Sequence, residues 1–594
     1  MNSAFGEEQN NKESYAAENA GGRVRDKALE KLLQTAIALG VLLRFIWAQK
    51  RELWYDEVLS VLLSSGQKSA YRLSQNTPIP VQDISQLLSI SHDSGGLQSA
   101  KDVIKGTLGD PHPPLFYLAQ HGWMRLFGNS EGALRCLMVL VSVAALWAAS
   151  VVGKQILGHR GGLIFTALLA LNPFFLSHSL NLRMYTPLVL WVLVSAGCLL
   201  AIAHSHLSEP SKDNVATATY SKKPSLRIWL LRLGLASSLT AGLLTHYLFA
   251  YWLFGLAALA LYLDAKRWIQ HGLTIGAGVG LFLPWALWGT RQQIHNRRDV
   301  LTQISAVGSP LQSAIQHSKD LAQTVANHLL LGHLTTSMEP IGQPIKPVAV
   351  AVGCGVIGFL VFCVFSLYRK RAYRILVVSV LMGVVPLLVA LGIDIAADKY
   401  TLGFGWGRSV MVALPGCLML LAAWLELYSA KWRVSLVTLV LGVYLCVNLG
   451  DFGMGGVGGR DRQMFHALSD HLVPTASPVL VALDTQAWGH VLRLAYYLQD
   501  GSNDNVSLLA TKPADMPDAI ASALDQTDYA QVLWLHADYP LWDKPETDEQ
   551  ARALSAQTER MLSRRLSSVS EARLLRGTMN LDRFVLHEYK PDYS

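Results

Sequence analysis

Long apolar runs constrain the fold of this chain more than any other feature of its sequence. A run of about 17 to 25 apolar residues can cross a bilayer as a helix. The chain is 51% hydrophobic and only 16% charged over 594 residues, which is more apolar than a soluble protein of this length. About eleven runs long enough to cross occur, at residues 31–48, 133–152, 161–179, 186–203, 228–246, 248–263, 272–289, 347–368, 375–394, 409–427 and 433–449. The sequence therefore predicts a polytopic α-helical membrane protein.

Basic residues are concentrated in every second connection between these runs. Examples are Lys154 with Arg160, Lys266 with Arg267, and the triplet at 369–371. Because basic loops tend to stay in the cytoplasm, this alternation predicts a cytoplasmic N-terminus, and it places the remaining loops and the C-terminal region outside. The net charge of +7 is then explained by basic residues in the cytoplasmic loops, and no nucleic-acid partner is expected.

One shorter apolar segment, at residues 113–127, affects this assignment. It carries Gln120, His121 and Arg125 and is too short to cross easily, so it is typical of an interfacial helix. Treating it as a span would invert every later loop and place the basic clusters outside. We therefore expect it to lie on the outer side.

The order of apolar and polar segments predicts five parts of the chain. After the last span, strand patterns at Val479–Leu483, Val506–Leu509, Val532–His536 and Phe584–Tyr589 alternate with helical patterns, which indicates an α/β domain. The predicted parts are a disordered cytoplasmic tail at 1–22, a membrane domain at 23–450 with outer loops at about 50–129 and 291–346, a glycine-rich hinge at 451–460, and an extracytoplasmic α/β domain at 461–594.

The cysteines lie inside the apolar runs and have no metal-type spacing, so we expect no disulfides. The predicted outer parts contain one glycosylation-type triplet, Asn505-Val506-Ser507. These features favour the plasma (inner) membrane of a bacterium as the location of the protein.

Two acids, Asp56 and Glu57, follow Trp54 and Tyr55 just after the first apolar run. A carboxylate at this depth ionises easily and lies close to lipid-borne groups, so Asp56 is the candidate catalytic base and Glu57 its neighbour in the site. The aromatic pair is expected to anchor the stretch at the membrane interface. The alternative is a solvated acidic pair that caps an interfacial helix.

Further candidate site residues lie at the outer ends of other predicted spans. His112 sits in a rigid proline-rich turn, which could also simply begin a helix. Arg183 and Arg408 could bind a lipid phosphate through the guanidinium fork or merely anchor helices in headgroups. The outer ends also carry aromatic and histidine side chains that are expected to line the site: Tyr185, His246 and Tyr247.

Three other patterns are not expected to be functional sites. Residues 453–458 match a dinucleotide fingerprint and 451–453 match a kinase triplet, but neither follows a strand in a βαβ unit. His204 and His206 lie at a predicted cytoplasmic helix end without a carboxylate partner in the sequence, so no metal site is expected there.

The motifs of the first half resemble those of a known family. An acidic pair follows the first span, then come His112-Pro113-Pro114-Leu115 and Leu126-Phe127-Gly128-Asn129-Ser130-Glu131, with Arg135 leading into the second span. This order resembles the GT-C glycosyltransferases of the protein mannosyltransferase and aminoarabinose transferase superfamily (glycosyltransferase family 39-like). The resemblance covers roughly residues 50–190 at motif level. Many relatives have an acid a few residues after Arg183, where this chain has Met184, Tyr185 and Thr186, so a second acidic or metal-ligating position is not expected from the pattern.

The resemblance implies transfer of a sugar from a polyprenyl-phosphate donor to an extracytoplasmic acceptor, which is a lipid, a protein or a glycan. It implies that Asp56 is the base, supported by Glu57, and that His112 and Arg183, together with Arg408, contact the donor phosphate. Direct displacement by the acceptor predicts inversion at the anomeric carbon. No cofactor is required, and a divalent metal is left open.

Two other functions compete with this one. A transporter or flippase of lipid-linked sugars would use the same arginines without a base, but the sequence has no evident inverted repeat. A non-catalytic envelope sensor or assembly subunit would use the outer α/β domain to bind a ligand.

Overall fold

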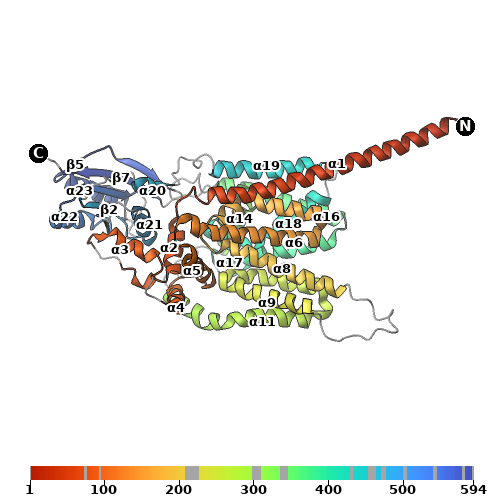
Figure 1. Cartoon of the computed structure of the whole chain (residues 1–594), viewed down its shortest axis with the longest axis horizontal. Coiled ribbons are helices and arrows are strands. Elements are labelled where there is room, and N and C mark those ends of the chain that lie inside the picture. The colour runs from red at the N-terminus through yellow and green to blue at the C-terminus, as the bar shows by residue number, and fades with distance from the viewer. Residues whose placement is uncertain are drawn as a thin grey trace.

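A bundle of long helices carries a smaller α/β domain at one end (Figure 1). The computed structural model describes the following residues: 2–72, 76–91, 95–207, 226–297, 310–334, 346–397, 399–427, 432–452, 463–469, 472, 477–499, 505–538, 545–577 and 582–591, without the side chains of 2–24, 310 and 346. The N-terminus lies at one end of the molecule and the α/β domain at the other (Figure 1). The helices of the bundle and its connections are α1 (Asn2–Trp47), α6 (Glu131–Leu171), α7 (Pro173–Ser179), α8 (Tyr185–Leu207), α9 (Leu226–Thr245), η4 (Tyr247–Phe249), α10 (Ala250–Asp264), η5 (Ala265–Arg267), α11 (Trp268–Trp285), η6 (Ala286–Thr290), α12 (Arg291–Asn296), α14 (Pro310–Ala326), η7 (Asn327–Leu331), α16 (Lys346–Arg369), α17 (Tyr373–Ala397), η8 (Phe404–Ala413), α18 (Leu414–Leu427) and α19 (Arg433–Phe452).

Within the described residues, 8 helical stretches are long and apolar enough to cross a bilayer. The stretch Tyr247–Asn296 contains two of the predicted apolar runs, and Glu131–Leu171 contains one run and the first part of the next, which continues into α7. Helix α1 holds residues 31–47 of the first predicted run but is not among the 8 stretches. Large apolar side chains such as Trp147, Leu281 and Val361 are exposed on the outside of the bundle, as lipid contact requires. The predicted polytopic helical fold is confirmed.

The long helix α6 reverses direction at Gly158. This glycine has φ +77°, which favours glycine, and it interrupts the helix. A Cβ atom on Gly153 would lie 2.9 Å from the Cα of Gly162, so the residues on either side of the turn pack together as a helical hairpin. The hairpin explains why one continuous helical stretch holds one apolar run and the first part of the next.

The first predicted outer loop folds into short helices between the bundle and the α/β domain (Figure 1). Its elements are α2 (Tyr55–Ser65), η1 (Lys68–Ala70), α3 (Val81–Ser85), η2 (Gln86–Leu88), α4 (Gly96–Thr107) and α5 (Leu115–Phe127). Helix α5 has 13 residues and buries Phe116, Tyr117 and Met124 against its neighbours. It is not among the stretches that can cross a bilayer, in agreement with the prediction for residues 113–127.

The C-terminal domain is built on a mixed sheet with helices on its faces. The sheet order is β1-β3-β2-β4-β7-β5, with β6 paired to β7; β3, β2 and β4 are parallel, and β7 runs antiparallel to β4. The four predicted strands are present within two residues at each end. The elements are β1 (Ile79–Pro80), α20 (Met464–Ser469), β2 (Val479–Leu483), α21 (Trp488–Leu498), β3 (Val506–Ala510), α22 (Met516–Gln526), β4 (Gln531–Ala537), α23 (Asp548–Ser563), β5 (Ser567–Ser568), β6 (Arg573–Arg576) and β7 (Arg583–Lys590).

The C-terminal domain is joined to the first loop by a strand and by buried polar contacts. Strand β1 of the loop pairs antiparallel with β3 and so completes the edge of the sheet. Glu52 accepts a hydrogen bond from Arg493 at 2.5 Å, and the Leu53 N–H donates to the Tyr497 hydroxyl at 2.6 Å. The acidic stretch after the first span is therefore in direct contact with the C-terminal domain.

The predicted tail, second outer loop and glycine hinge differ from the described structure or lie partly outside it. Helix α1 begins at Asn2, so it covers the residues for which a disordered tail is predicted, and its end projects beyond the other helices (Figure 1). The loop predicted at 291–346 contains helix α14, which packs against α16, and residues 298–309 and 335–345 of it lie outside the described part. Most of the predicted glycine hinge, from 453 onward, also lies outside the described part.

Candidate active site

The stretch with the two acids begins helix α2. Trp54 is the N-cap residue in an extended conformation, and Asp56 and Glu57 lie in the first turn. The Glu57 carboxylate accepts a hydrogen bond from the Trp54 N–H at 2.9 Å, which ties the side chain of Glu57 back to the start of the helix. Acids in the first turn also interact favourably with the helix dipole. This local structure fixes the direction in which each acid points.

Glu57 is fully buried and bound on all sides. Its carboxylate pairs with Arg51 at 3.3 Å and Arg135 at 3.2 Å, and it accepts from the Leu182 N–H at 2.8 Å. Burial alone would raise the pKa of Glu57, but Arg135, Arg51 and the backbone N–H groups hold it below its ordinary value. Glu57 therefore joins α2, α6 and the segment before α8, and it presents no exposed carboxylate.

Asp56 is in a different environment from its neighbour. Its side chain is 22% exposed, and its Oδ2 lies 3.2 Å from Nη2 of Arg408 and 4.0 Å from Nη2 of Arg183. The Nε atoms of both arginines are buried without a hydrogen-bond acceptor among the described residues. The Nε atoms of other buried arginines in this part of the chain, Arg44 and Arg135 among them, have no acceptor either, so this feature does not set the cluster apart. What sets it apart is that two guanidinium groups, which can bind an anion, lie beside one partly exposed carboxylate.

The backbone before Arg408 adopts an unusual conformation that places this side chain. Gly405, Trp406 and Gly407 have φ values of +56°, +59° and +88°. A tryptophan in the left-handed region is strained and persists only where its surroundings hold it. Asn327 donates to the Trp406 carbonyl at 3.1 Å, and His328 Nε2 lies 2.9 Å from the Gly407 carbonyl oxygen. The second loop thus holds Arg408 in place.

Aromatic rings surround the Arg408 guanidinium. Its Cζ atom lies 5.3 Å from the Trp54 ring centroid, 5.6 Å from that of Tyr185 and 5.4 Å from that of Phe404. Such cation–π contacts stabilise a charged guanidinium away from water. Trp54 is only 6% exposed, so it packs inside the protein beside Arg408. The expectation that Trp54 is an interface anchor is therefore wrong, because its ring is buried against the protein and is not presented to the membrane surface.

Arg183 lies in the short connection between α7 and α8. It donates to the Ser60 hydroxyl at 3.0 Å and to the Asp56 carbonyl oxygen at 3.4 Å. Both contacts are to helix α2, so Arg183 is held beside the acid from a distant part of the sequence. The resemblance implies this proximity, and the structure places the two side chains together.

His112 and Asp110 form a bonded pair next to this cluster. His112 Nδ1 lies 2.8 Å from Asp110 Oδ1, which also accepts from the His112 N–H at 3.0 Å and from the Tyr117 hydroxyl at 3.1 Å. Burial works against the charge on Asp110, but His112 above all, with Arg183 and Lys68 nearby, holds the pKa of this carboxyl well below its ordinary value. Asp110 thus fixes the orientation of His112.

His246 and Tyr247 have different relations to the site. The His246 ring packs edge-on against His112, with centroids 5.5 Å apart, and lies 6.2 Å from the Tyr185 ring. The Tyr247 hydroxyl donates to Gln293 and accepts from Trp285 and Thr290. Gln293 in turn donates to the His112 carbonyl oxygen at 2.8 Å. His246 therefore adjoins the site, whereas Tyr247 acts on the His112 turn through Gln293.

The structure brings most of the predicted site residues into one continuous set of contacts. The chain of contacts runs from Asp56 through Arg408 and Tyr185 to His246 and His112. Sequence reasoning did not single out Arg51, Ser60 or Gln293, which hold these side chains in place. The sequence identifies Arg135 only as part of the family motif. The structure shows its role, because its buried side chain forms an ion pair with Glu57.

One group of residues in the described part offers three atoms that could bind a metal ion, and it lies away from this site. It consists of His206, Asp264 and His271. The sequence argument against a metal at His206 rests on the absence of a carboxylate partner, and that argument is wrong. Asp264 lies 58 positions further along the chain, and Asp264 Oδ2 is 2.8 Å from His206 Nδ1.

Structural comparisons find several membrane glycosyltransferases, all at low similarity. ArnT from Cupriavidus metallidurans in the apo state matches with 13% identity over 94% of this chain and 98% of that chain, with a TM-score of 0.38. An oligosaccharyltransferase from Archaeoglobus fulgidus matches with 11% identity over 92% of this chain and 73% of that chain, with a TM-score of 0.42. The protein O-mannosyltransferase Pmt1-Pmt2 complex of S. cerevisiae matches with 12% identity over 45% of this chain and 34% of that chain, with a TM-score of 0.30. Values this low carry no argument about function.

Sequence comparison gives the more specific result. No curated protein matches the chain. Residues 111–209 match the family model described as dolichyl-phosphate-mannose-protein mannosyltransferase. This match confirms the resemblance to the GT-C glycosyltransferases of the protein mannosyltransferase type, through a segment that contains His112, Arg183 and Tyr185.

Proposed function

We propose that this protein is a membrane glycosyltransferase that moves a sugar from a polyprenyl-phosphate donor to an acceptor on the outer side of the membrane. The observation that carries the proposal is the cluster of Asp56 with Arg183 and Arg408. The carboxylate is partly exposed, and both guanidinium groups lie within 4.0 Å of it. One base beside two anion-binding groups is the set of side chains that this reaction needs.

In the proposed reaction the donor phosphate binds between Arg183 and Arg408. The two guanidinium groups stabilise the negative charge that develops on the leaving phosphate. Asp56 takes the proton of the acceptor, and the acceptor oxygen or nitrogen forms a bond to the anomeric carbon as the bond to the phosphate oxygen breaks. A single displacement of this kind inverts the configuration at the anomeric carbon.

The surrounding residues have supporting roles in this proposal. His112, oriented by Asp110, contacts the donor, and Tyr185 and His246 line the site next to it. Glu57 supports the base indirectly, since it fixes the start of α2 through Arg51 and Arg135. Loss of Glu57 is therefore expected to act through the fold.

We also infer that the N-terminus lies in the cytoplasm and that the site and the C-terminal domain lie outside, in a bacterial inner membrane. The alternation of basic loops supports this orientation. A cysteine introduced at the exposed Lys101 is expected to react with an impermeant reagent added outside intact cells, and one at the exposed Lys370 only after lysis. The opposite labelling pattern would contradict the orientation.

The reaction is tested with purified protein and radiolabelled polyprenyl-phosphate sugars. We expect time-dependent loss of sugar from the lipid and its appearance on an acceptor fraction. A transporter or flippase would change the side of the membrane on which the labelled lipid lies without breaking the sugar–phosphate bond. An envelope sensor would do neither.

A further inference from the structure

A cluster of His206, Asp264 and His271 lies at the end of the bundle opposite to the site. His206 is in the last turn of α8, which begins at Tyr185 in the site, so the two residues are about 30 Å apart along the helix. Asp264 ends α10 and His271 is in the first turn of α11. The short η5 turn joins α10 to α11, which brings Asp264 and His271 together.

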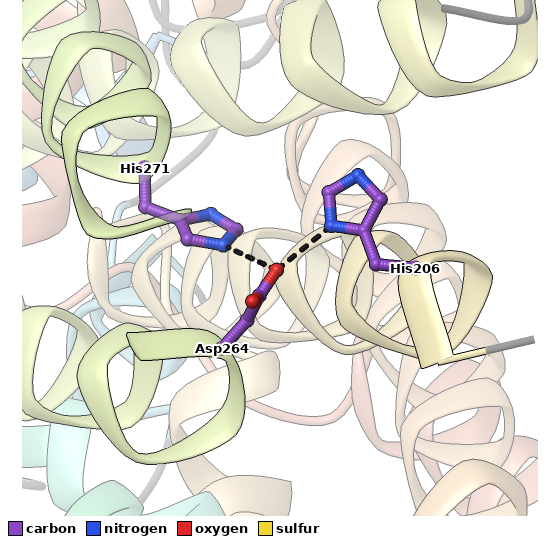
Figure 2. Close-up of side chains that lie close together, drawn as sticks. All are labelled: His206, Asp264 and His271. Atoms are coloured by element: carbon purple, nitrogen blue, oxygen red, sulfur yellow. Dashed lines mark hydrogen bonds and ion pairs between the residues drawn. The ribbon is translucent and has the colours of Figure 1, made fainter. Parts of the chain in front are cut away.

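The three side chains point toward one another. Figure 2 shows both imidazole rings directed at the same carboxylate oxygen. Asp264 Oδ2 lies 2.8 Å from His206 Nδ1 and 3.3 Å from His271 Nε2, and all three atoms lie within 4.8 Å of one another. The side chains of His206, Asp264 and His271 are 5%, 11% and 4% exposed, so the cluster is nearly closed to solvent.

We propose that this cluster binds a divalent transition-metal ion of the zinc class. Two imidazole nitrogens and one carboxylate oxygen are a donor set typical of zinc, with a fourth position for water. Metal–ligand distances of about 2.0 to 2.2 Å place tetrahedral ligand atoms about 3.4 Å apart. The observed separations from the carboxylate oxygen are close to this value, so small rotations of the side chains would admit the ion.

The simpler account of the cluster is a set of hydrogen bonds from two histidines to one aspartate. Arg267 Nη1 also lies 3.6 Å from Asp264 Oδ2, and a cation there competes with a metal. The Arg267 side chain is 32% exposed, so it can turn toward solvent when an ion binds. The hydrogen-bonded cluster needs a proton on His206 Nδ1 and on His271 Nε2, whereas the metal site needs both nitrogens free of protons. Metal binding therefore separates the two accounts.

A bound ion would join the ends of three helices, and two of these, α8 and α10, carry site residues at their other ends. Helix α8 begins with Tyr185, and the segment that leads into α10 contains His246 and Tyr247. The metal would hold these helices together without taking part in the reaction. This role does not depend on the proposed glycosyltransferase activity.

The test is zinc binding to the purified full-length protein in detergent after treatment with a chelator. We expect the wild-type protein to take up about one equivalent of zinc and to unfold at a higher temperature when zinc is added. The variant with both His206→Ala and His271→Ala is expected to lose at least tenfold in affinity and to show no thermal shift. His204→Ala, on the same turn of α8 and exposed, is the matched control and should bind zinc like the wild type.

A measurement on the wild-type protein alone covers the case in which the double variant does not fold. Cobalt(II) added to the chelated protein should give the visible absorption of a tetrahedral nitrogen and oxygen site. Wild-type protein that retains neither zinc nor cobalt, or a folded double variant that binds zinc as the wild type does, would overturn the proposal.

Discussion

Asp56 and Glu57 are neighbours in sequence, but they lie in opposite environments. Each acid lies near two arginines. Glu57 is fully buried, and its carboxylate is used by Arg51, Arg135 and two backbone N–H groups, whereas Asp56 is 22% exposed and lies beside Arg408 and Arg183. A fully buried ion-pair network supports the fold, and a partly exposed carboxylate is accessible to a substrate. The two environments therefore predict different consequences when either acid is changed.

The largest expected effect is on stability, from Glu57→Gln. The change leaves Arg51 and Arg135 buried without their counter-charge, which costs about 3–5 kcal/mol of unfolding free energy. Thermal unfolding of the purified variant measures this effect, with Asp56→Asn as the matched control. A Glu57→Gln protein that unfolds at the wild-type temperature would show that the two acids do not differ in this way.

Arg408→Ala tests the environment of Asp56, the second acid of the comparison. Removing one group that stabilises the leaving phosphate is expected to lower the transfer rate by about a hundredfold. The unfolding temperature should change less than in Glu57→Gln, because Arg408 and its partner Asp56 are partly exposed, so water can solvate the carboxylate that is left. Arg408→Lys keeps the charge without the planar fork and should recover only part of the rate. Full activity of Arg408→Ala would exclude a role in phosphate binding.

Glu52 is a third acid in the same stretch, and it predicts a pH dependence. Burial raises its pKa from 4.5 to about 7, although Arg493 opposes the shift. Between these two values the folded chain holds a proton that the unfolded chain has lost. Stability therefore falls as the pH rises from 4.5 to about 7 and then levels off, by roughly 3 kcal/mol.

Glu52→Gln is the control for this pH effect, since the amide does not titrate. Its unfolding temperature should depend less on pH over the same range. An equal dependence in both proteins would assign the effect to another group. Because Glu52 contacts Arg493 of the C-terminal domain, the measurement also reports on the attachment of that domain.

The smallest expected effect comes from Tyr247→Phe. The hydroxyl contacts Gln293, which holds the His112 turn from a distance. Loss of this contact is expected to cost about 1 kcal/mol of stability and to leave transfer within tenfold of the wild type. A loss as large as that of Arg408→Ala would place Tyr247 in direct contact with the substrate.

Much of the fold could be predicted from the sequence, because apolar run length and strand alternation follow directly from burial. The membrane bundle and the strands β2, β3, β4 and β7 lie where these patterns place them. Strand β1 could not be predicted, since Ile79 and Pro80 pair with a strand more than 400 positions away. The six cysteines are all free, as their positions in apolar runs predict.

Most of the predicted site residues lie together in the structure, but their arrangement could not be predicted. Charged and polar side chains at the outer ends of spans are costly there, which singles them out. Their partners were not visible, because Arg51, Ser60 and Gln293 have ordinary surroundings in the sequence and gain their roles only through packing. The same limit explains the error at His206, whose carboxylate partner Asp264 lies on another helix.

The rate of sugar transfer by Asp56→Asn, measured next to its unfolding temperature, tests the central claim most directly. Asparagine keeps the size of the side chain but cannot accept the proton of the acceptor. We expect the rate to fall by about 100- to 10,000-fold while the unfolding temperature stays near that of the wild type, the reverse of the pattern for Glu57→Gln. A folded Asp56→Asn protein that transfers sugar at the wild-type rate would contradict the account.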